Sequence, residues 1–246
     1  MCYCQEPLDY EIFKNIQPFL PPIPIVTARK YRANFMEKGI TPQFLPCFPK
    51  AVIMFRHAVH KFPEEKIIKI GLRHGAYHFK KLSSAGSYNK FDVFLMTSSH
   101  EVQVAQSTGI STGRAVGFPK LDPLFNGKLS DEILESYRRK VKLNKTKKTV
   151  LFTATWDGSG MSAAETWIPV LPKLVDSYNV MVSVHPWSSA KLKKRIRNQP
   201  GIYFIQDADV VPYLALADIM VGDTSSVIAE FCALNKPIIT VQTGEA

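Results

Sequence analysis

The sequence lacks an apolar run that approaches the roughly 18–20 residues of a membrane helix. Its N-terminus also lacks a basic region followed by an uninterrupted apolar stretch, so we expect no transmembrane helix and no secretory signal. Cysteines are few: Cys2 and Cys4 lie at an end that we expect to be frayed, and Cys47 and Cys232 lie far apart. This distribution excludes a disulfide framework and makes a poor zinc site. We therefore expect a reduced, cytoplasmic protein.

Common nucleotide and metal motifs are missing as well. The absence of GxxxxGKS, GxxxxGKT and GxGxxG sequences disfavours ATP hydrolysis by a P-loop enzyme. There is no HExxH sequence, and no acidic residue occurs between Leu72 and Ser87, the stretch in which His74 and His78 are four residues apart. Because a metal site needs three or four ligands, we expect no metal.

Positive charge is abundant. The 246 residues carry a formal net charge of +10 and have a pI near 9.4, with 46% apolar and 21% charged residues, which is typical of a soluble globular protein of one large or two small domains. The excess favours an anionic partner, although a solvated basic surface explains it equally well.

The basic run 191–197 has an apolar edge of Leu192 and Ile196, which is typical of a solvated helix. No aromatic platform supports nucleic-acid binding.

A charged segment divides the chain. Residues 129–148 begin with Ser130, a candidate helix N-cap, and end in a polar linker. After it, helical stretches alternate with strand candidates, as in a parallel sheet; these candidates are TVLFTATW, NVMVSVHP, GIYFIQ, DIMVGD and KPIITVQ. In the first half the strand candidates are IPIVTA, AVIMFRH, IIKIGLRH and FDVFLMTS, with PFLPPIP as an extended lead-in to the first. We predict two α/β domains, over residues 1–128 and 129–246.

Polar residues follow three of the predicted strands. His74 and Gly75 come after IIKIGL, His185 and Pro186 after NVMVSV, and the turn 223–226 after DIMVG. In open α/β sheets, ligands bind outside the carboxyl ends of the strands. The three clusters therefore reinforce one another as parts of a binding site.

The turn formed by Asp223, Thr224, Ser225 and Ser226 opens a predicted amphipathic helix. Free backbone N–H groups and short hydroxyls at such a position can bind a phosphate. The alternative is that these side chains only cap the helix. A second loop, 157–162, carries Gly158 and Gly160 among serines and offers a weaker signal of the same kind.

The stretch RHGAYHFKK, residues 73–81, offers a candidate base. A histidine at a glycine turn after a strand faces the ligand edge, and its ordinary pKa suits proton abstraction, so His74 is the candidate. Lys80 and Lys81 would then supply positive charge near a leaving phosphate. The alternative is a merely basic loop. The other histidines His57, His60 and His100 are expected to be ordinary surface or core residues.

Taken together, these segments resemble the CDP-glycerol glycerophosphotransferase family, the polymerases and primases of teichoic acid synthesis. The resemblance runs from about Ile67 to Val241 and rests on five segments in order. The first is RHG, followed after four residues by KK, and the others are GFPKLD, TVLFTATW, VHP and ADIMVGDTSSVIAEFCALNKPII. The chain departs from the usual family pattern at Ala76-Tyr77-His78 and at Ala154. The resemblance implies an α/β GT-B-like fold with two Rossmann-like halves, parallel sheets and a cleft between them. It also implies further helices after the closing strand, so the chain is either a compact variant or ends before them.

The resemblance also implies roles for individual residues. His74 would be the base that deprotonates the acceptor hydroxyl, and His185 would act with it at the reacting phosphate. Ser225 and Ser226, with His185, would hold the pyrophosphate of the donor. Asp223 would orient that turn or contact the donor, and the donor and phosphate site would be completed by Gly75, Lys80 and Thr224.

The implied reaction moves glycerol phosphate, or a related polyol phosphate, from a CDP-linked donor to an acceptor hydroxyl, with release of CMP. The expected partners are a CDP-polyol such as CDP-glycerol, a lipid-linked or polymeric anionic acceptor, and the inner face of the cell membrane as a peripheral contact. No cofactor and no nucleic acid are expected. One alternative is a GT-B glycosyltransferase or epimerase that uses a UDP-sugar, and another is a non-catalytic module that binds polyanions.

Overall fold

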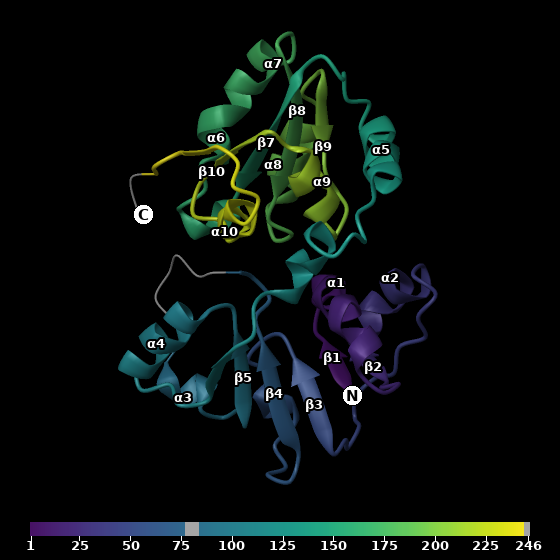
Figure 1. Cartoon of the computed structure of the whole chain (residues 1–246), viewed down its shortest axis with the longest axis vertical. Helices are drawn as coiled ribbons and strands as arrows, with labels where there is room; N and C mark the ends of the chain where they lie inside the picture. Colours follow the sequence, from purple (N-terminus) through teal and green to yellow (C-terminus); the bar gives the residue numbers. More distant parts are fainter. Residues whose placement is uncertain (77–83, 244–246) are drawn as a thin grey trace. The chain divides into compact units, whose positions relative to one another are not determined.

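The computed structural model describes residues 1–76 and 84–243. The chain divides into two compact units, an N-terminal unit, Met1–Asp122, and a C-terminal unit, Pro123–Ala246 (Figure 1). Each unit is built on its own sheet of parallel strands, which agrees with the predicted α/β fold class. No helix in the described part of the chain combines the length and the apolar character needed to cross a bilayer.

The N-terminal unit contains a six-stranded sheet in the order β2-β1-β3-β4-β5-β6. Its strands are β1 Cys2–Cys4, β2 Ile25–Thr27, β3 Ala51–Met54, β4 Ile68–Leu72, β5 Val93–Met96 and β6 Gly113–Ala115. The connecting helices are α1 Pro7–Ile16, η1 Gln17–Phe19, η2 Arg29–Tyr31, α2 Arg32–Met36, η3 Val59–Lys61, α3 Ala85–Tyr88, α4 Ser99–Ser107 and η4 Pro119–Leu124. Buried residues of neighbouring strands, such as Val26, Met54 and Phe94, share one core cluster.

The expectation of a frayed N-terminus is wrong. Cys2 and Cys4 belong to β1, which lies between β2 and β3, and both side chains are fully buried. Pairing on both sides explains why so short a strand is stable, because its backbone groups are satisfied by two neighbours. The proline-rich stretch therefore leads into β2, the second strand of the chain, rather than into the first.

Asp9, in the first turn of α1, gives the N-terminal unit a pH-dependent stability. Its carboxylate accepts a hydrogen bond from the backbone N–H of Glu6 at 3.0 Å and lies 3.5 Å from Nε of Arg56. The side chain is fully buried, and this burial raises the pKa of Asp9 to about 6 in spite of Arg56. The folded protein therefore holds a proton that the unfolded chain releases near pH 4.

We expect the free energy of unfolding to fall as the pH rises from about 4 to about 6, because the folded state binds more protons in this window. The loss attributable to Asp9 is on the order of 3 kcal/mol. Urea unfolding across this pH range should show a flatter profile for Asp9→Asn than for the unaltered chain. Asp131→Asn, at an exposed carboxylate, is the control and should keep the original slope. A slope unchanged by Asp9→Asn would contradict this assignment.

The C-terminal unit contains a five-stranded sheet in the order β11-β10-β7-β8-β9. Its strands are β7 Lys148–Ala154, β8 Tyr178–Val184, β9 Ile202–Phe204, β10 Ile219–Gly222 and β11 Ile238–Thr240, which confirm all five strands predicted for this half. The helices are α5 Asp131–Lys140, η5 Asp157–Ser159, α6 Ala164–Trp167, η6 Ile168–Val170, α7 Leu171–Leu174, α8 Ala190–Arg197, α9 Val211–Leu216 and α10 Val227–Cys232.

The side chains of β7 and β8 point alternately to the two faces of the sheet. Val150, Phe152 and Val182 share a core cluster with Trp167 of α6 and Ile196 of α8. Leu151 and Thr153 of β7 and Met181 of β8 are buried as well, and in a strand such intervening residues point to the opposite face of the sheet. The basic helix α8 thus buries its apolar edge, and Ser130 caps α5 as expected, accepting from the backbone N–H of Ile133 at 3.4 Å.

Candidate active site

Three polar segments of the C-terminal unit lie at one edge of its sheet. Thr155 follows β7, His185 follows β8 and Asp223 follows β10. These three strands are neighbours in the order β10-β7-β8 and run parallel, so their carboxyl ends meet at the same edge. This is the edge at which open α/β sheets bind their ligands.

The carboxylate of Asp223 holds this edge together. It accepts hydrogen bonds from the backbone N–H groups of Thr155 at 2.9 and 3.1 Å, of Ala163 at 2.9 Å and of Ser225 at 3.0 Å. Its side chain is buried, and burial raises the pKa of Asp223 while these backbone hydrogen bonds act in the opposite direction. Asp223 therefore fixes the turn that follows it to the ends of two other segments.

The serine turn does not serve as a helix cap. Ser226 occupies the N-cap position of α10, yet its side chain makes no capping hydrogen bond. The hydroxyl oxygen of Thr224 is buried and finds no hydrogen-bond partner within the described part of the chain. Before the turn, Gly222 packs so closely that a Cβ there would lie 2.8 Å from Oγ1 of Thr153. The Ser226 side chain therefore does not cap α10, and the turn is held instead by the hydrogen bond from the Ser225 N–H to Asp223.

His185 is held in one tautomer. Its Nδ1 accepts a hydrogen bond from the backbone N–H of Trp187 at 3.1 Å, and its own backbone N–H donates to the carbonyl of Ala154 at 3.2 Å. Because a backbone N–H can only donate, Nδ1 carries no proton and the neutral ring bears its proton on Nε2. His185 can therefore donate from Nε2, as a ligand for phosphate oxygens requires.

Trp187 lies beside His185 and Trp156 lies beside Trp187, and no role was predicted for either. The ring of Trp187 lies 5.3 Å from that of His185 and 6.1 Å from that of Trp156. Trp187 is 57% exposed, which is unusual for so large an apolar side chain. Its position directly after the His185-Pro186 pair is the only signal that could have identified it.

His74 belongs to the N-terminal unit and has the opposite tautomer. It follows β4, and its Nδ1 lies 3.1 Å from the backbone carbonyl of Phe55. A carbonyl can only accept, so Nδ1 carries the proton and the neutral ring has its lone pair on Nε2. The preceding residue, Arg73, is buried in an ion pair with Glu101 and donates to the hydroxyl of Tyr88 at 3.0 Å, which anchors the loop.

The remaining residues predicted for this loop are only partly described. Gly75 is buried directly after His74. Lys80, together with His78 and Lys81, lies outside the described residues. Across residues 1–76 and 84–243, no group of three or more His, Cys, Asp or Glu side chains is placed to hold a metal ion.

Comparison with known proteins gives one family and several relatives. A family model described as CDP-Glycerol:Poly(glycerophosphate) glycerophosphotransferase matches residues 67–244. The teichoic acid ribitol-phosphate polymerase TarK of Staphylococcus aureus is 25% identical over 211 residues, covering 81% of this chain and 40% of that protein. The teichoic acid poly(ribitol-phosphate) polymerase of Bacillus spizizenii is 25% identical over 197 residues, covering 76% of this chain and 31% of that protein. The chain thus spans less than half the length of these relatives.

Solved structures confirm the fold class. The wall teichoic acid polymerase TagF aligns with a TM-score of 0.71 at 14% identity, covering 96% of this chain and 68% of that chain. A UDP-N-acetylglucosamine 2-epimerase from Rickettsia bellii aligns with a TM-score of 0.60 at 15% identity, covering 96% of this chain and 76% of that chain. At these identities the likeness concerns the fold alone, which is GT-B-like with two Rossmann-like halves.

Proposed function

The chain belongs to the CDP-glycerol:poly(glycerophosphate) glycerophosphotransferase family, and we propose that it transfers a polyol phosphate from a CDP-linked donor to an acceptor hydroxyl. The observation that carries this proposal is the family match, because residues 67–244 include His74, His185 and the turn after Asp223. The acceptor would be an anionic, teichoic-acid-like chain or its lipid-linked primer. The reaction would take place on the cytoplasmic side of the membrane, with peripheral contact at its inner face.

The C-terminal unit supplies a site suited to the donor pyrophosphate. Asp223 accepts from the backbone N–H of Ser225, so the backbone that carries Thr224, Ser225 and Ser226 is positioned before the ligand arrives. His185 would add an N–H donor from Nε2. Fixed donors of this kind stabilise the charge that develops on a leaving phosphate.

In the proposed reaction, His74 acts as the base. The acceptor oxygen attacks the β-phosphorus, the bond between that phosphorus and the bridging oxygen breaks, and CMP leaves. The hydroxyl proton passes to Nε2 of His74, because Nδ1 faces the carbonyl of Phe55 and carries the proton of the neutral ring. Gly75 and Lys80 would complete the phosphate-facing part of this loop.

We expect the double variant Ser225→Ala with Ser226→Ala to bind CDP-glycerol at least about tenfold more weakly, because each lost hydrogen bond to a charged group is worth 1.5–3 kcal/mol. Quenching of tryptophan fluorescence is a suitable measurement, since exposed Trp187 lies beside His185. Ser136→Ala with Ser177→Ala removes two exposed hydroxyls of the same unit and should change nothing.

The donor class can be tested in the same titration. CDP-glycerol should displace bound CMP at concentrations at which UDP-N-acetylglucosamine does not. Equal displacement by the UDP-sugar would argue for UDP-sugar chemistry instead. An unchanged affinity in the serine variant would show that the serine turn does not hold the donor. Salt-sensitive binding of polyanions without any effect of nucleotides would argue for a non-catalytic module.

A further inference from the structure

The C-terminal unit has a second hollow, far from the serine turn. A cavity of about 570 Å³ lies where β7, β8 and β10 begin, next to residues 143–148. These are the amino ends of strands whose carboxyl ends carry Thr155, His185 and Asp223. Because β7 has seven residues, the two edges are about 20 Å apart. The cavity is therefore separate from the candidate active site.

The lining of this cavity carries excess positive charge. Its cationic side chains are Arg138, Lys145, Lys147, Lys148 and Lys236, and its carboxylates are those of Glu135 and Asp218. Five positive charges thus face two negative ones. No described lining residue is aromatic, so the cavity offers no platform on which a nucleic-acid base could stack.

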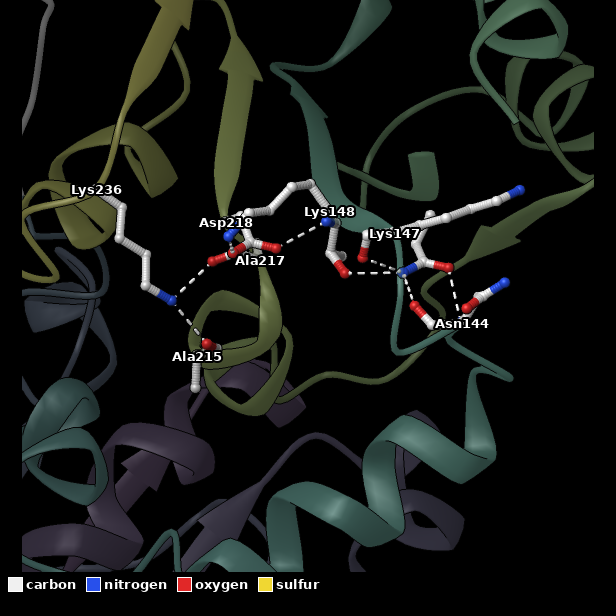
Figure 2. A network of polar contacts seen from close by, with 9 residues as sticks. Asn144, Lys147, Lys148, Ala215, Ala217, Asp218 and Lys236 are labelled. Atoms are coloured by element: carbon white, nitrogen blue, oxygen red, sulfur yellow. Dashed lines mark hydrogen bonds and ion pairs between the residues drawn. The ribbon is translucent and has the colours of Figure 1, made fainter. Parts of the chain in front are cut away.

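Both carboxylates are already paired. Glu135 lies 2.9 Å from Nζ of Lys145 and 3.4 Å from a guanidinium nitrogen of Arg138, and Asp218 lies 3.0 Å from Nζ of Lys148 (Figure 2). Added anions would therefore meet a surplus of cations rather than a balanced network.

Two of the cations are held by uncharged groups. Lys147 donates to the carbonyl of Val175 at 2.9 Å. Lys236 donates to the carbonyls of Ala215 and Ala217 at 2.7 Å each (Figure 2). An ammonium has three N–H donors, so Lys236 has one donor beyond these two hydrogen bonds. Burial lowers the pKa of Lys236, which is the sign of a positive charge that its surroundings compensate incompletely.

The loop that carries three of the lysines is fixed before any ligand binds. The side chain of Asn179 accepts from the backbone N–H of Asn144 at 2.8 Å and donates to the carbonyls of Asn144 at 2.9 Å and Lys147 at 3.0 Å. Asn144 in turn accepts from the backbone N–H of Thr146 at 2.9 Å. A loop ordered in this way loses little conformational entropy on binding.

We propose that this cavity is a second anion site, which binds the phosphate groups of a phosphate ester or phosphodiester. Lysine ammonium groups suit phosphate oxygens as compact point charges, and several of them around one hollow fit a ligand with more than one negative charge. Such a group could come from a free phosphate compound or from a phosphodiester-linked polyol chain. The second source rests on the proposed function, whereas the first does not.

The test is a titration of the full-length, nitrogen-15-labelled chain with sodium pyrophosphate, followed by NMR. We expect shifts of the backbone amides of residues 144–149, Asn179 and Asp218. The triple variant Lys145→Gln, Lys147→Gln, Lys148→Gln should bind at these residues at least about tenfold more weakly. The matched control Lys173→Gln, Lys191→Gln, Lys194→Gln removes as many exposed cations from the same unit without touching the cavity.

The outcomes are distinct. Shifts at the cavity that weaken only in the cavity variant support the proposal, whether or not the chain has transferase activity. Shifts confined to other residues, or equal weakening in both variants, overturn it. A parallel titration with a glycerol-phosphate oligomer identifies the source: tighter binding than pyrophosphate at the same amides points to a polyol-phosphate chain, and weaker binding points to a free phosphate compound.

Discussion

Replacing His74 with alanine is expected to lower the rate of polyol-phosphate transfer about 10³-fold, while donor affinity stays nearly unchanged. The reason lies in the tautomer: Nδ1–H faces the carbonyl of Phe55 at 3.1 Å, so the basic nitrogen is Nε2. Alanine removes that base, whereas His185 and the serine turn, which would hold the donor pyrophosphate, belong to the C-terminal unit. The rate would be measured as CMP release at saturating donor, and affinity by tryptophan fluorescence.

The control for this variant is His60→Ala, which removes an exposed histidine of the same unit. It should leave both the rate and the affinity as they are. If His74→Ala retained the rate of the unaltered chain, His74 would not be the base. If it instead lost donor binding in proportion to rate, the histidine would act in binding rather than in proton transfer.

Replacing Asp223 with alanine is expected to destabilise the C-terminal unit by about 3 kcal/mol or more. The carboxylate accepts from the backbone N–H groups of Thr155, Ala163 and Ser225, and its removal leaves these buried donors without their partner. Each unsatisfied buried group costs about 1–3 kcal/mol. Urea unfolding at neutral pH measures the loss.

Two variants sharpen this test. Asp223→Asn keeps one acceptor oxygen and should lose less stability than Asp223→Ala. Asp218→Ala acts at the opposite end of β10, where a half-exposed carboxylate accepts from one backbone N–H, that of Thr149, at 2.8 Å, so its cost should be about 1 kcal/mol. A loss from Asp223→Ala no larger than that from Asp218→Ala would show that Asp223 does not hold the three segments together.

Much of the C-terminal half could be predicted from the sequence. Its five strands are apolar runs separated by turn residues, and each run was long enough to stand out against the helices between them. The N-terminal half was harder, because β1 lies at the very start of the chain and β6, Gly113–Ala115, contains no apolar run. Their stability comes from pairing with neighbouring strands, which a local pattern does not reveal.

The sequence predicted at which strand ends the site residues lie, but not which residues they contact. The rule that ligands bind at the carboxyl ends of strands identified the clusters at His74, His185 and Asp223. It did not reveal that Asp223 binds the N–H of Ala163, which is 60 residues away, because such a contact depends on the tertiary fold. The opposite tautomers of His74 and His185 likewise depend on Phe55 and on the backbone of Trp187.

The central claim is transfer from a CDP-linked donor, and CMP release by the unaltered chain tests it most directly. The chain would be incubated with CDP-glycerol, with and without a glycerol-phosphate-primed lipid acceptor. We predict CMP release that requires the acceptor and matches the glycerol phosphate it gains. A chain that binds CDP-glycerol no better than UDP-N-acetylglucosamine, and that releases no CMP with the acceptor present, would contradict the account.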